Sequence, residues 1–312
     1  MQHNDRATRT TAARVSRRGL LAGAGAGAAL LGTAAPAAAA PARSGRSAAE
    51  IVDVVGRADG IDLRRNRVPA GVVRFDITAA AGATPSVGVI RLRAGVSVET
   101  YLTHYLLATD PDPVTRRRAV QLIDSEAFYF GGGSTGGSAR VSWTTVLTPG
   151  DYHLLNWSAA ATGGFRDGVR KLTVTAPVTA PAALPPTDGT VAAYDEGYQG
   201  RYLVAPELPG SAALTVWNQT GQLNEAVFWG LQPGKTAADV QVFFDAARNG
   251  TPPPPWPFSS GPYGATPLSP GASGISHLTL PPGDYIVTSF ISNRRTSVKR
   301  AFEGMWSLVT VR

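Results

Sequence analysis

The chain has 312 residues, no cysteine, and a formal charge of +7 from 29 basic and 22 acidic side chains. The missing cysteine excludes disulfides, thiolate nucleophiles, cysteine-ligated metals and a cysteine-linked lipid anchor. With 43% hydrophobic residues the chain can bury a core, and its length allows one large or two ordinary domains. Its 35 glycines and 24 prolines are more than a helical protein usually contains.

Residues 1–40 have the order of an export signal. Five arginines lie in the first 18 residues, an uncharged Gly/Ala/Leu run follows, and the run ends in small residues suited to cleavage. The pair Arg17-Arg18 before Gly19 matches the twin-arginine pattern. We therefore expect twin-arginine export, cleavage and a secreted protein without a membrane span. An uncleaved membrane anchor is the alternative, since the apolar run is long enough to span.

Loss of this signal changes the electrostatic picture. It removes five basic residues and one acid, which leaves 24 basic and 21 acidic residues and a net charge of about +3. The remaining arginine pairs and triplets, such as 116–118, are short and diluted by nearby acids. A nucleic-acid-binding face needs clustered positive charge, so we expect no nucleic-acid partner.

After a flexible start at 41–49, the first predicted domain covers 50–176. Alternating and β-branched residues predict strands at 72–77 and 138–146, followed by a turn at 149–151. Apolar spacing predicts helices over 98–107 and 113–128, with Asp112 or Thr115 as the N-cap of the second. Gly-rich 131–136 matches the nucleophile-elbow and dinucleotide patterns, but no helix follows it. We therefore predict a loop there.

A Pro/Ala-rich linker over 177–189 precedes the second predicted domain, 190–312. Strands are predicted at 213–217, 285–291 and 306–311, with a turn at 282–284. A helix is predicted over 236–247, where Thr236 is placed to cap and Asp239 lies three residues later.

The two halves repeat one pattern of short motifs in the same order. Examples at offsets of 140, 139 and 133 residues are Pro69 and Pro209, Gly95 and Gly234, and the Pro-Gly-Asp-Tyr runs ending at Tyr152 and Tyr285. Short strands with Gly/Pro turns and few helices favour a β-sandwich in each half. We therefore predict an all-β fold of two tandem sandwiches, each with a short helical insertion.

The second half resembles the cupredoxin-like domains of actinobacterial secreted proteins. The resemblance covers nearly all of 195–312, and the first half shares it mainly through its similarity to the second. It implies a Greek-key β-sandwich similar to plastocyanin and azurin. The segments that carry it are Trp217-Asn-Gln-Thr-Gly221, Leu231-Gln-Pro-Gly-Lys-Thr236, Pro252-Pro-Pro-Pro-Pro-Trp256, Leu268-Ser-Pro-Gly271, Leu280-Pro-Pro-Gly-Asp-Tyr285 and Phe302-Glu-Gly-Met305.

Blue-copper members of that family bind copper through one Cys, two His and a weak axial Met. The resemblance places the Cys at Ser289, or at Asn156 in the first half, and the upstream His near Asn224, or at Pro85 or Ser86. The resemblance places the other His in the loop before Gly304, but this loop contains arginine and lysine and no histidine. Of the four ligands, only the Met is present, as Met305. The resemblance thus implies the scaffold without the metal, and we expect no metal and no cofactor.

The sequence gives little sign of other metal sites or of catalytic residues. His104, His153 and His277 lack metal-ligand spacing, and no catalytic residues are predicted. The proline-rich loop at Trp256, with Phe258 and Tyr263, has two interpretations. It forms a rigid apolar surface for a sugar ring or a partner protein, or it covers the open end of the sandwich where the copper-binding relatives keep their metal.

The sequence therefore favours a secreted, copper-free, cupredoxin-like protein that acts as a non-catalytic binding or structural module at or outside the cell envelope. Its partner would be an unidentified protein or a cell-wall polysaccharide. One alternative is an envelope carbohydrate-binding protein that uses the aromatics near Trp256. A second alternative is an enzyme with an unrecognised active site.

Overall fold

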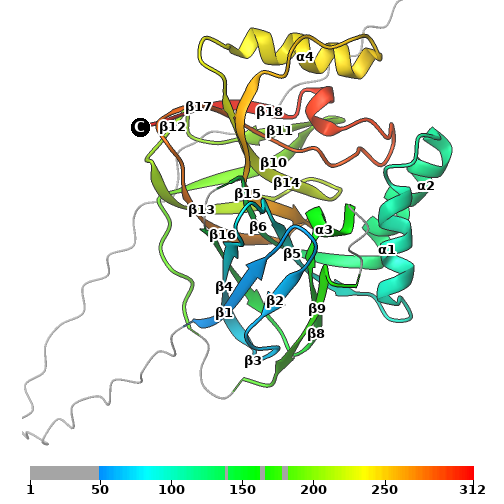
Figure 1. Cartoon of the computed structure of the whole chain (residues 1–312), viewed down its shortest axis with the longest axis vertical. Coiled ribbons are helices and arrows are strands. Elements are labelled where there is room, and N and C mark those ends of the chain that lie inside the picture. Colours follow the sequence, from blue (N-terminus) through cyan, green and yellow to red (C-terminus); the bar gives the residue numbers. More distant parts are fainter. Residues whose placement is uncertain (1–48, 138–139, 162–165, 178–181) are drawn as a thin grey trace, which may run out of the picture. The chain divides into compact units, whose positions relative to one another are not determined.

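The computed structural model describes residues 49–137, 140–161, 166–177 and 182–312. The predictions made for 1–40, including Arg17 and Arg18, and for most of 41–49 lie outside these residues. Residues Gly45–Arg312 form one compact unit, drawn in colour from residue 49 on in Figure 1. Within the described part of the chain, no helix is long and apolar enough to cross a membrane.

The described residues of the first half form nine strands and three helices. Its strands are β1 (Glu50–Gly56), β2 (Ile61–Leu63), β3 (Arg67–Pro69), β4 (Gly71–Ala79), β5 (Ser86–Leu92), β6 (Ala127–Thr135), β7 (Arg140–Leu147), β8 (Gly150–Asn156) and β9 (Val169–Thr175). Its helices are α1 (Val98–Leu107), α2 (Pro113–Glu126) and α3 (Trp157–Ala161).

The second half contains nine strands, one α-helix and a 3₁₀ turn. Its strands are β10 (Gly189–Glu196), β11 (Gln199–Leu203), β12 (Glu207–Leu208), β13 (Ser211–Asn218), β14 (Asn224–Leu231), β15 (Phe258–Leu268), β16 (Ser273–Thr279), β17 (Gly283–Thr288) and β18 (Trp306–Val311). The helix is α4 (Ala237–Asn249), and the 3₁₀ turn is η1 (Arg300–Glu303).

These strands form two mixed sheets that both run through the two halves. One sheet has the order β11-β10-β13-β16-β7-β4-β1-β2, and the other β12-β18-β17-β14-β15-β6-β5-β8-β9-β3. Each order reads symmetrically about its centre, because every pairing in the first half has a counterpart in the second. For example, β1 pairs parallel with β4 as β10 pairs with β13. The strand pairing therefore repeats as the sequence motifs do.

The chain crosses repeatedly between the sheets, as expected of Greek-key topology. In the second half β15 leads to β16 in the other sheet, and β17 then returns beside β14 rather than beside β15. The predicted all-β sandwich with helical insertions is thus confirmed.

The seam between the halves consists of antiparallel strand pairs. β16 pairs with β7, with Ile275 opposite Thr144, and β15 pairs with β6, with Gly264 opposite Ser134. Equivalent strands of the repeat therefore meet each other. Hydrogen bonding across the seam makes each sheet continuous, and the main hydrophobic core draws on both halves.

Trp143 of β7 closes this seam. Its ring is fully buried and lies against Gly131 of β6 and Gly274 of β16, so that a Cβ at either glycine would lie 2.3 or 2.2 Å from the ring. The loop predicted over 131–136 is wrong, because 127–135 is strand β6. Its glycines have no side chains and so show no alternating pattern in the sequence. Glycine in a strand allows another group to approach the backbone closely, as Trp143 does here.

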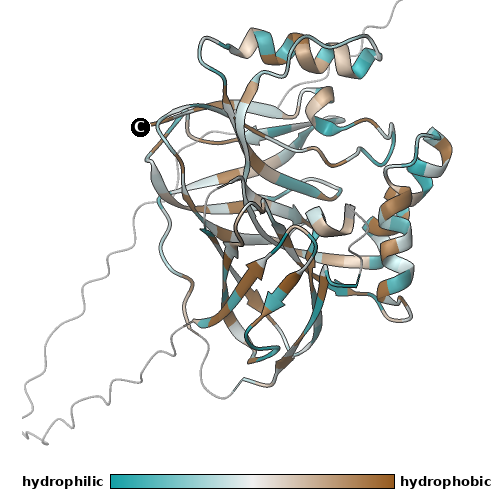
Figure 2. Ribbon diagram, viewed as in Figure 1, coloured by the Kyte–Doolittle hydropathy of each residue, from teal (hydrophilic) through white to brown (hydrophobic). Residues whose placement is uncertain are grey.

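The helices differ in what they cover. Along α4, Figure 2 shows hydrophobic and hydrophilic residues alternating, and its buried face of Val240, Phe243 and Phe244 packs within its own half. By contrast, the cluster under α1 and α2 includes Leu223 and draws in Ile291, both from the second half. The first helical insertion therefore bridges the two halves.

The helix predictions hold closely. Helix α1 has the predicted bounds, and α2 is capped by Asp112, whose carboxylate accepts the backbone N–H groups of Val114 and Thr115. It ends at Glu126 rather than 128, because Ala127 already pairs in β6. Thr236 and Asp239 form the predicted capping box of α4.

The seam can be tested with Gly274→Ala. Gly274 has no positive φ, so its substitution reports only the contact with Trp143. We expect urea denaturation to show a loss of about 1–3 kcal/mol, the usual cost of overpacking. The control is Gly189→Ala in β10, where the nearest atom to a new Cβ is 3.5 Å away. It should leave stability unchanged or raise it by up to about 1 kcal/mol. Equal effects would contradict the close packing at the seam.

Candidate functional site

Two of the positions at which the resemblance places copper ligands in the second half lie together in the fold. Ser289 follows β17, Asn224 begins β14, and the Ser289 Oγ donates to the Asn224 Oδ1 at 3.2 Å. Asn224 Nδ2 donates to the Thr220 Oγ1 at 2.6 Å. The side chains of Ser289 and Asn224 are buried, at 1% exposure or less. Ser289, Asn224 and Thr220 therefore form a buried cluster held by hydrogen bonds.

The first half has the equivalent pair. Asn156 ends β8 and is fully buried, and its Oδ1 accepts the backbone N–H of Ser86 at 3.4 Å. Its Nδ2 donates to the carbonyls of Arg57 and Gly60, both at 2.8 Å. Asn156 therefore ties the β1–β2 turn to the sheet, a structural role that uses the whole amide.

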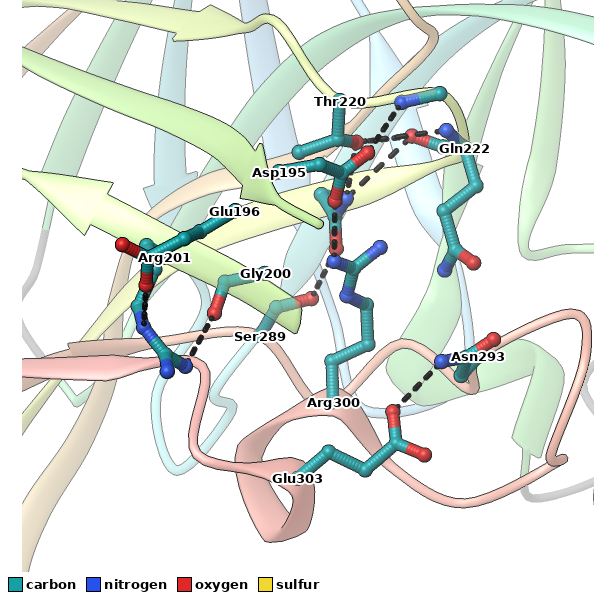
Figure 3. A network of polar contacts seen from close by, with 12 residues as sticks. Asp195, Glu196, Gly200, Arg201, Thr220, Gln222, Ser289, Asn293, Arg300 and Glu303 are labelled. Atoms are coloured by element: carbon teal, nitrogen blue, oxygen red, sulfur yellow. Dashed lines mark hydrogen bonds and ion pairs between the residues drawn. The ribbon is translucent and has the colours of Figure 1, made fainter. Parts of the chain in front are cut away.

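A buried arginine lies beside the second-half cluster. Arg300, in the segment where the downstream His was expected, has a side chain 4% exposed and binds the Asp195 carboxylate at 2.7 Å. Figure 3 shows this ion pair below Thr220 and Gln222. The Arg300 guanidinium and the Met305 sulfur both pack on Gly200, where a Cβ would lie 2.2 and 2.5 Å from them.

The groups present do not fit copper. A type 1 site requires a thiolate and two imidazoles, and here a hydroxyl and an amide hydrogen-bond each other beside a guanidinium. Met305 is fully buried, and its backbone oxygen accepts the Thr288 hydroxyl, as expected of a core residue. Across the described residues, no group of three or more His, Cys, Asp or Glu could hold a metal ion.

The three histidines among the described residues remain apart. His104 Nδ1 lies 2.7 Å from the Glu126 Oε1 between α1 and α2. His153 is in β8 and His277 is in β16, which belong to different sheets. Burial lowers the pKa of His153, and the nearby Lys171 lowers it further. Burial and then Arg74 lower the pKa of His277 in the same way. They do not form a joint site.

The aromatic surface predicted near Trp256 is reduced to one residue. Trp256 is 42% exposed, but Phe258 and Tyr263 are 3% and 8% exposed, so including them in a surface was wrong. Trp256 packs edge-on against Trp229, Phe243 and Phe258, which fixes the loop to α4. The alternative that this loop covers the copper end is also wrong. Phe258 pairs with Leu231, at the opposite end of β14 from Asn224.

A cavity with one aromatic wall, the aromatic cavity, lies between the first helical insertion and the second half. Its volume is about 230 Å³. Helices α1 and α2 line one side, with Tyr129 and Trp157 behind them, and β14 and the segment after β17 line the other. In Figure 1 this segment, in orange and red, runs from β17 toward α2. Gln121 of α2 donates to the Arg294 carbonyl at 3.3 Å, which links the two sides.

One wall of the cavity is aromatic. The Tyr105 and Trp157 rings lie 4.9 Å apart, and Tyr101 and Tyr129 pack around Trp157 at 6.5 and 6.3 Å. The hydroxyls of Tyr101 and Tyr129 are 2.7 Å apart. Burial raises the pKa of both, and that of Tyr105 to about 12, so these rings stay neutral. The wall is a rigid, uncharged surface suited to apolar ring contacts.

The opposite wall carries ionisable groups. Burial raises the pKa of Glu225 to about 7, although the Phe290 N–H, 2.8 Å from its carboxylate, and the Lys299 ammonium oppose this shift. Burial lowers the pKa of Lys299, with Glu225 opposing. Burial also raises the pKa of Asp124, whose Oδ2 lies 3.8 Å from Arg294. Among the described residues Lys299 forms no ion pair, so its ammonium remains available to a ligand.

Sequence reasoning missed this cavity. Glu225 is a single acid in a strand, Lys299 is one of several bases in a loop, and Tyr105 belongs to an ordinary amphipathic helix. They meet only because two halves of the chain pack together. The one sequence signal was the extra length of the first helical insertion, which has two helices where the second half has one.

No protein-family model matches the sequence, and no curated protein does. Similar solved structures include auracyanin of Roseiflexus castenholzii, 21% identical over 39% of this chain and 96% of its own, with a TM-score of 0.25. A multicopper oxidase is 13% identical over 84% and 88%, with a TM-score of 0.22. Copper nitrite reductase of Nitrosomonas europaea is 9% identical over 85% and 94%, with a TM-score of 0.23. These values carry no argument about activity, and the fold rests on the strand pairing above.

The raised pKa of Glu225 predicts a pH-dependent stability. Between its ordinary value of 4.5 and about 7, the folded chain keeps a proton that the unfolded chain releases, so stability falls as pH rises through this window. Glu225→Gln removes the charge, and at pH 8 it should be more stable than the natural chain by on the order of 3 kcal/mol. At pH 4 the two should be similar.

Urea denaturation of both chains from pH 4 to 8 measures this difference. The amide oxygen that Glu225→Gln introduces can still accept the Phe290 N–H, so the fold should persist. Glu196→Gln, at a side chain 68% exposed and outside the cavity, is the control. Parallel pH curves for the natural chain and Glu225→Gln would contradict a buried, proton-holding Glu225.

Proposed function

We propose that this chain is a binding protein that holds a small organic molecule, with a ring-containing apolar body, in the cavity between its halves. The carrying observation is a 230 Å³ space that has aromatic rings on one wall and Glu225 and Lys299 on the other. Ligand sites are typically concave and mostly apolar, with a few polar groups that fix orientation.

The two charged groups support binding over a purely structural role. Burying Glu225 and Lys299 costs stability, and the shifts of both pKa values reflect this cost. A cavity wall that served only packing would hold apolar residues instead. Perturbed ionisable groups beside a cavity are typical of functional sites.

We further propose that the protein acts outside the cell or at its envelope. The arginine pair Arg17-Arg18 and the uncharged run to Ala40 support export by the twin-arginine route. The organic ligand would then be met outside the cytoplasm. A partner protein or polysaccharide at Trp256 remains a second proposal, supported by the 42% exposure of that ring.

The export proposal predicts that Arg17→Lys combined with Arg18→Lys stops secretion, because the pathway reads the arginine pair itself. Immunoblots of cells and culture medium would show the chain retained and at its full mass. Arg9→Lys with Arg14→Lys keeps the same charge and the arginine pair, and should be secreted normally. Normal secretion of the first variant would rule out this route.

Isothermal titration calorimetry tests the cavity proposal, with 2-naphthoate and naphthalene-2-carboxamide as the two probes. Ala108 lines the cavity at the end of α1, and Ala108→Phe should lower the affinity about tenfold or more because its ring occupies the space. Thr103→Phe introduces the same ring on the exposed side of α1 and should bind as the natural chain does. If neither probe binds the natural chain, or if Ala108→Phe binds unchanged, the proposal fails.

A further inference from the structure

We propose that the ligand is an organic anion, a ring-bearing carboxylate whose head group binds at Arg294 between the aromatic cavity and a smaller polar pocket. This inference rests on the proposed function and names the ligand class for the same site.

The two spaces are neighbours that share part of their lining. The smaller pocket, about 70 Å³, is lined by Tyr198, Gly221, Asn293 and three arginines, and it shares Gln222 and Arg294 with the aromatic cavity. Figure 3 shows three residues of its lining, Gln222, Asn293 and Arg300. A molecule in the aromatic cavity therefore has Arg294 in the lining around it, at the side where the arginines gather.

Hydrogen bonds hold the two residues, Gln222 and Arg294, that lie between the two spaces. Gln222 is 6% exposed, and its Oε1 accepts the backbone N–H of Arg294 at 3.2 Å. The Arg294 carbonyl accepts Gln121 of α2. The Arg294 backbone is thus held from both halves, while its side chain is 46% exposed and has a long ion pair with Asp124, at 3.8 Å.

The cations around both spaces are incompletely neutralised. Of the four, only Arg300 has a carboxylate at hydrogen-bond distance, Asp195 at 2.7 Å. Arg294 lies 3.8 Å from Asp124, beyond hydrogen-bond length. Arg295 stacks over the Tyr198 ring at 4.8 Å, and among the described residues neither it nor Lys299 has an ion pair. Arg295 and Lys299 therefore have no ion pair among the described residues, and Arg294 has only the long one with Asp124.

The acids at the site are consistent with an anion. Asp195 is already paired with Arg300. Burial raises the pKa of Asp124, although Arg294 opposes this shift, and it raises the pKa of Glu225 to about 7. The groups that face Glu225 are Tyr105 of α1, Tyr202 of β11 and Lys299. A carboxylate near Lys299 would therefore meet a carboxyl group that can keep its proton. Arginine binds carboxylates in a planar, two-bond geometry, which suits this head group.

The experiment compares three probes with one ring system by calorimetry on the full chain at pH 7. They are 2-naphthoate, which is ionised there, the neutral naphthalene-2-carboxamide, and the cation 2-naphthylmethylamine. We expect naphthoate to bind about tenfold or more tightly than the carboxamide, as a charge-assisted hydrogen bond provides. Arg294→Gln should remove that advantage and leave carboxamide binding unchanged. Arg294→Lys should keep most of it.

Arg248→Gln, at an exposed arginine in the last turn of α4, is the matched control and should change nothing. Equal binding of naphthoate and carboxamide, or tightest binding of the amine, overturns the anion inference while the proposed function stands. Loss of carboxamide binding in Arg294→Gln would show that Arg294 acts on the cavity itself, and it also overturns the inference. If no probe binds, the proposed function fails and the inference fails with it.

Discussion

Antiparallel pairing between equivalent strands is the constraint on which the rest of this structure depends. β7 meets β16 and β6 meets β15, so an eight-stranded and a ten-stranded sheet each pass through both halves. Trp143 can sit at this junction only because Gly131 and Gly274 have no side chains. Backbone hydrogen bonds and a shared core thus fix how the halves face each other, which a flexible linker alone would leave open.

The two sheets are symmetric between the halves, but the helical insertions are not. Both insertions lie between equivalent strands, β5 and β6 in one half and β14 and β15 in the other. The single helix α4 packs on its own half, whereas α1 and α2 reach Leu223 and Ile291 of the other. The cavity exists because this one insertion spans the seam. Its position therefore follows from the fixed pairing below it.

Much of the fold could be predicted from the sequence, and the failures have physical causes. Alternation and capping residues act locally, so the bounds of α1 and the Thr236 cap of α4 were predictable. Strand β6 was missed because its glycines carry no pattern, and the groups that approach them, such as Trp143 at Gly131 and Val141 at Gly133, belong to another strand. The resemblance singled out Asn224 and Ser289, which hydrogen-bond each other in the fold. The cavity was not predictable, because Glu225 and Tyr105 become neighbours only through packing.

The Asn224–Ser289 cluster and the cavity differ in how far their polar groups are satisfied. Around Ser289 each buried polar group has a partner, and Arg300 has Asp195, so the cluster is satisfied and rigid. One residue further along β14, Glu225 accepts one backbone N–H and otherwise faces Lys299, on the same wall of the cavity. Two adjacent residues of one strand therefore differ in role. Asn224 belongs to the satisfied cluster, and Glu225 lines the cavity between the halves, where burial raises its pKa.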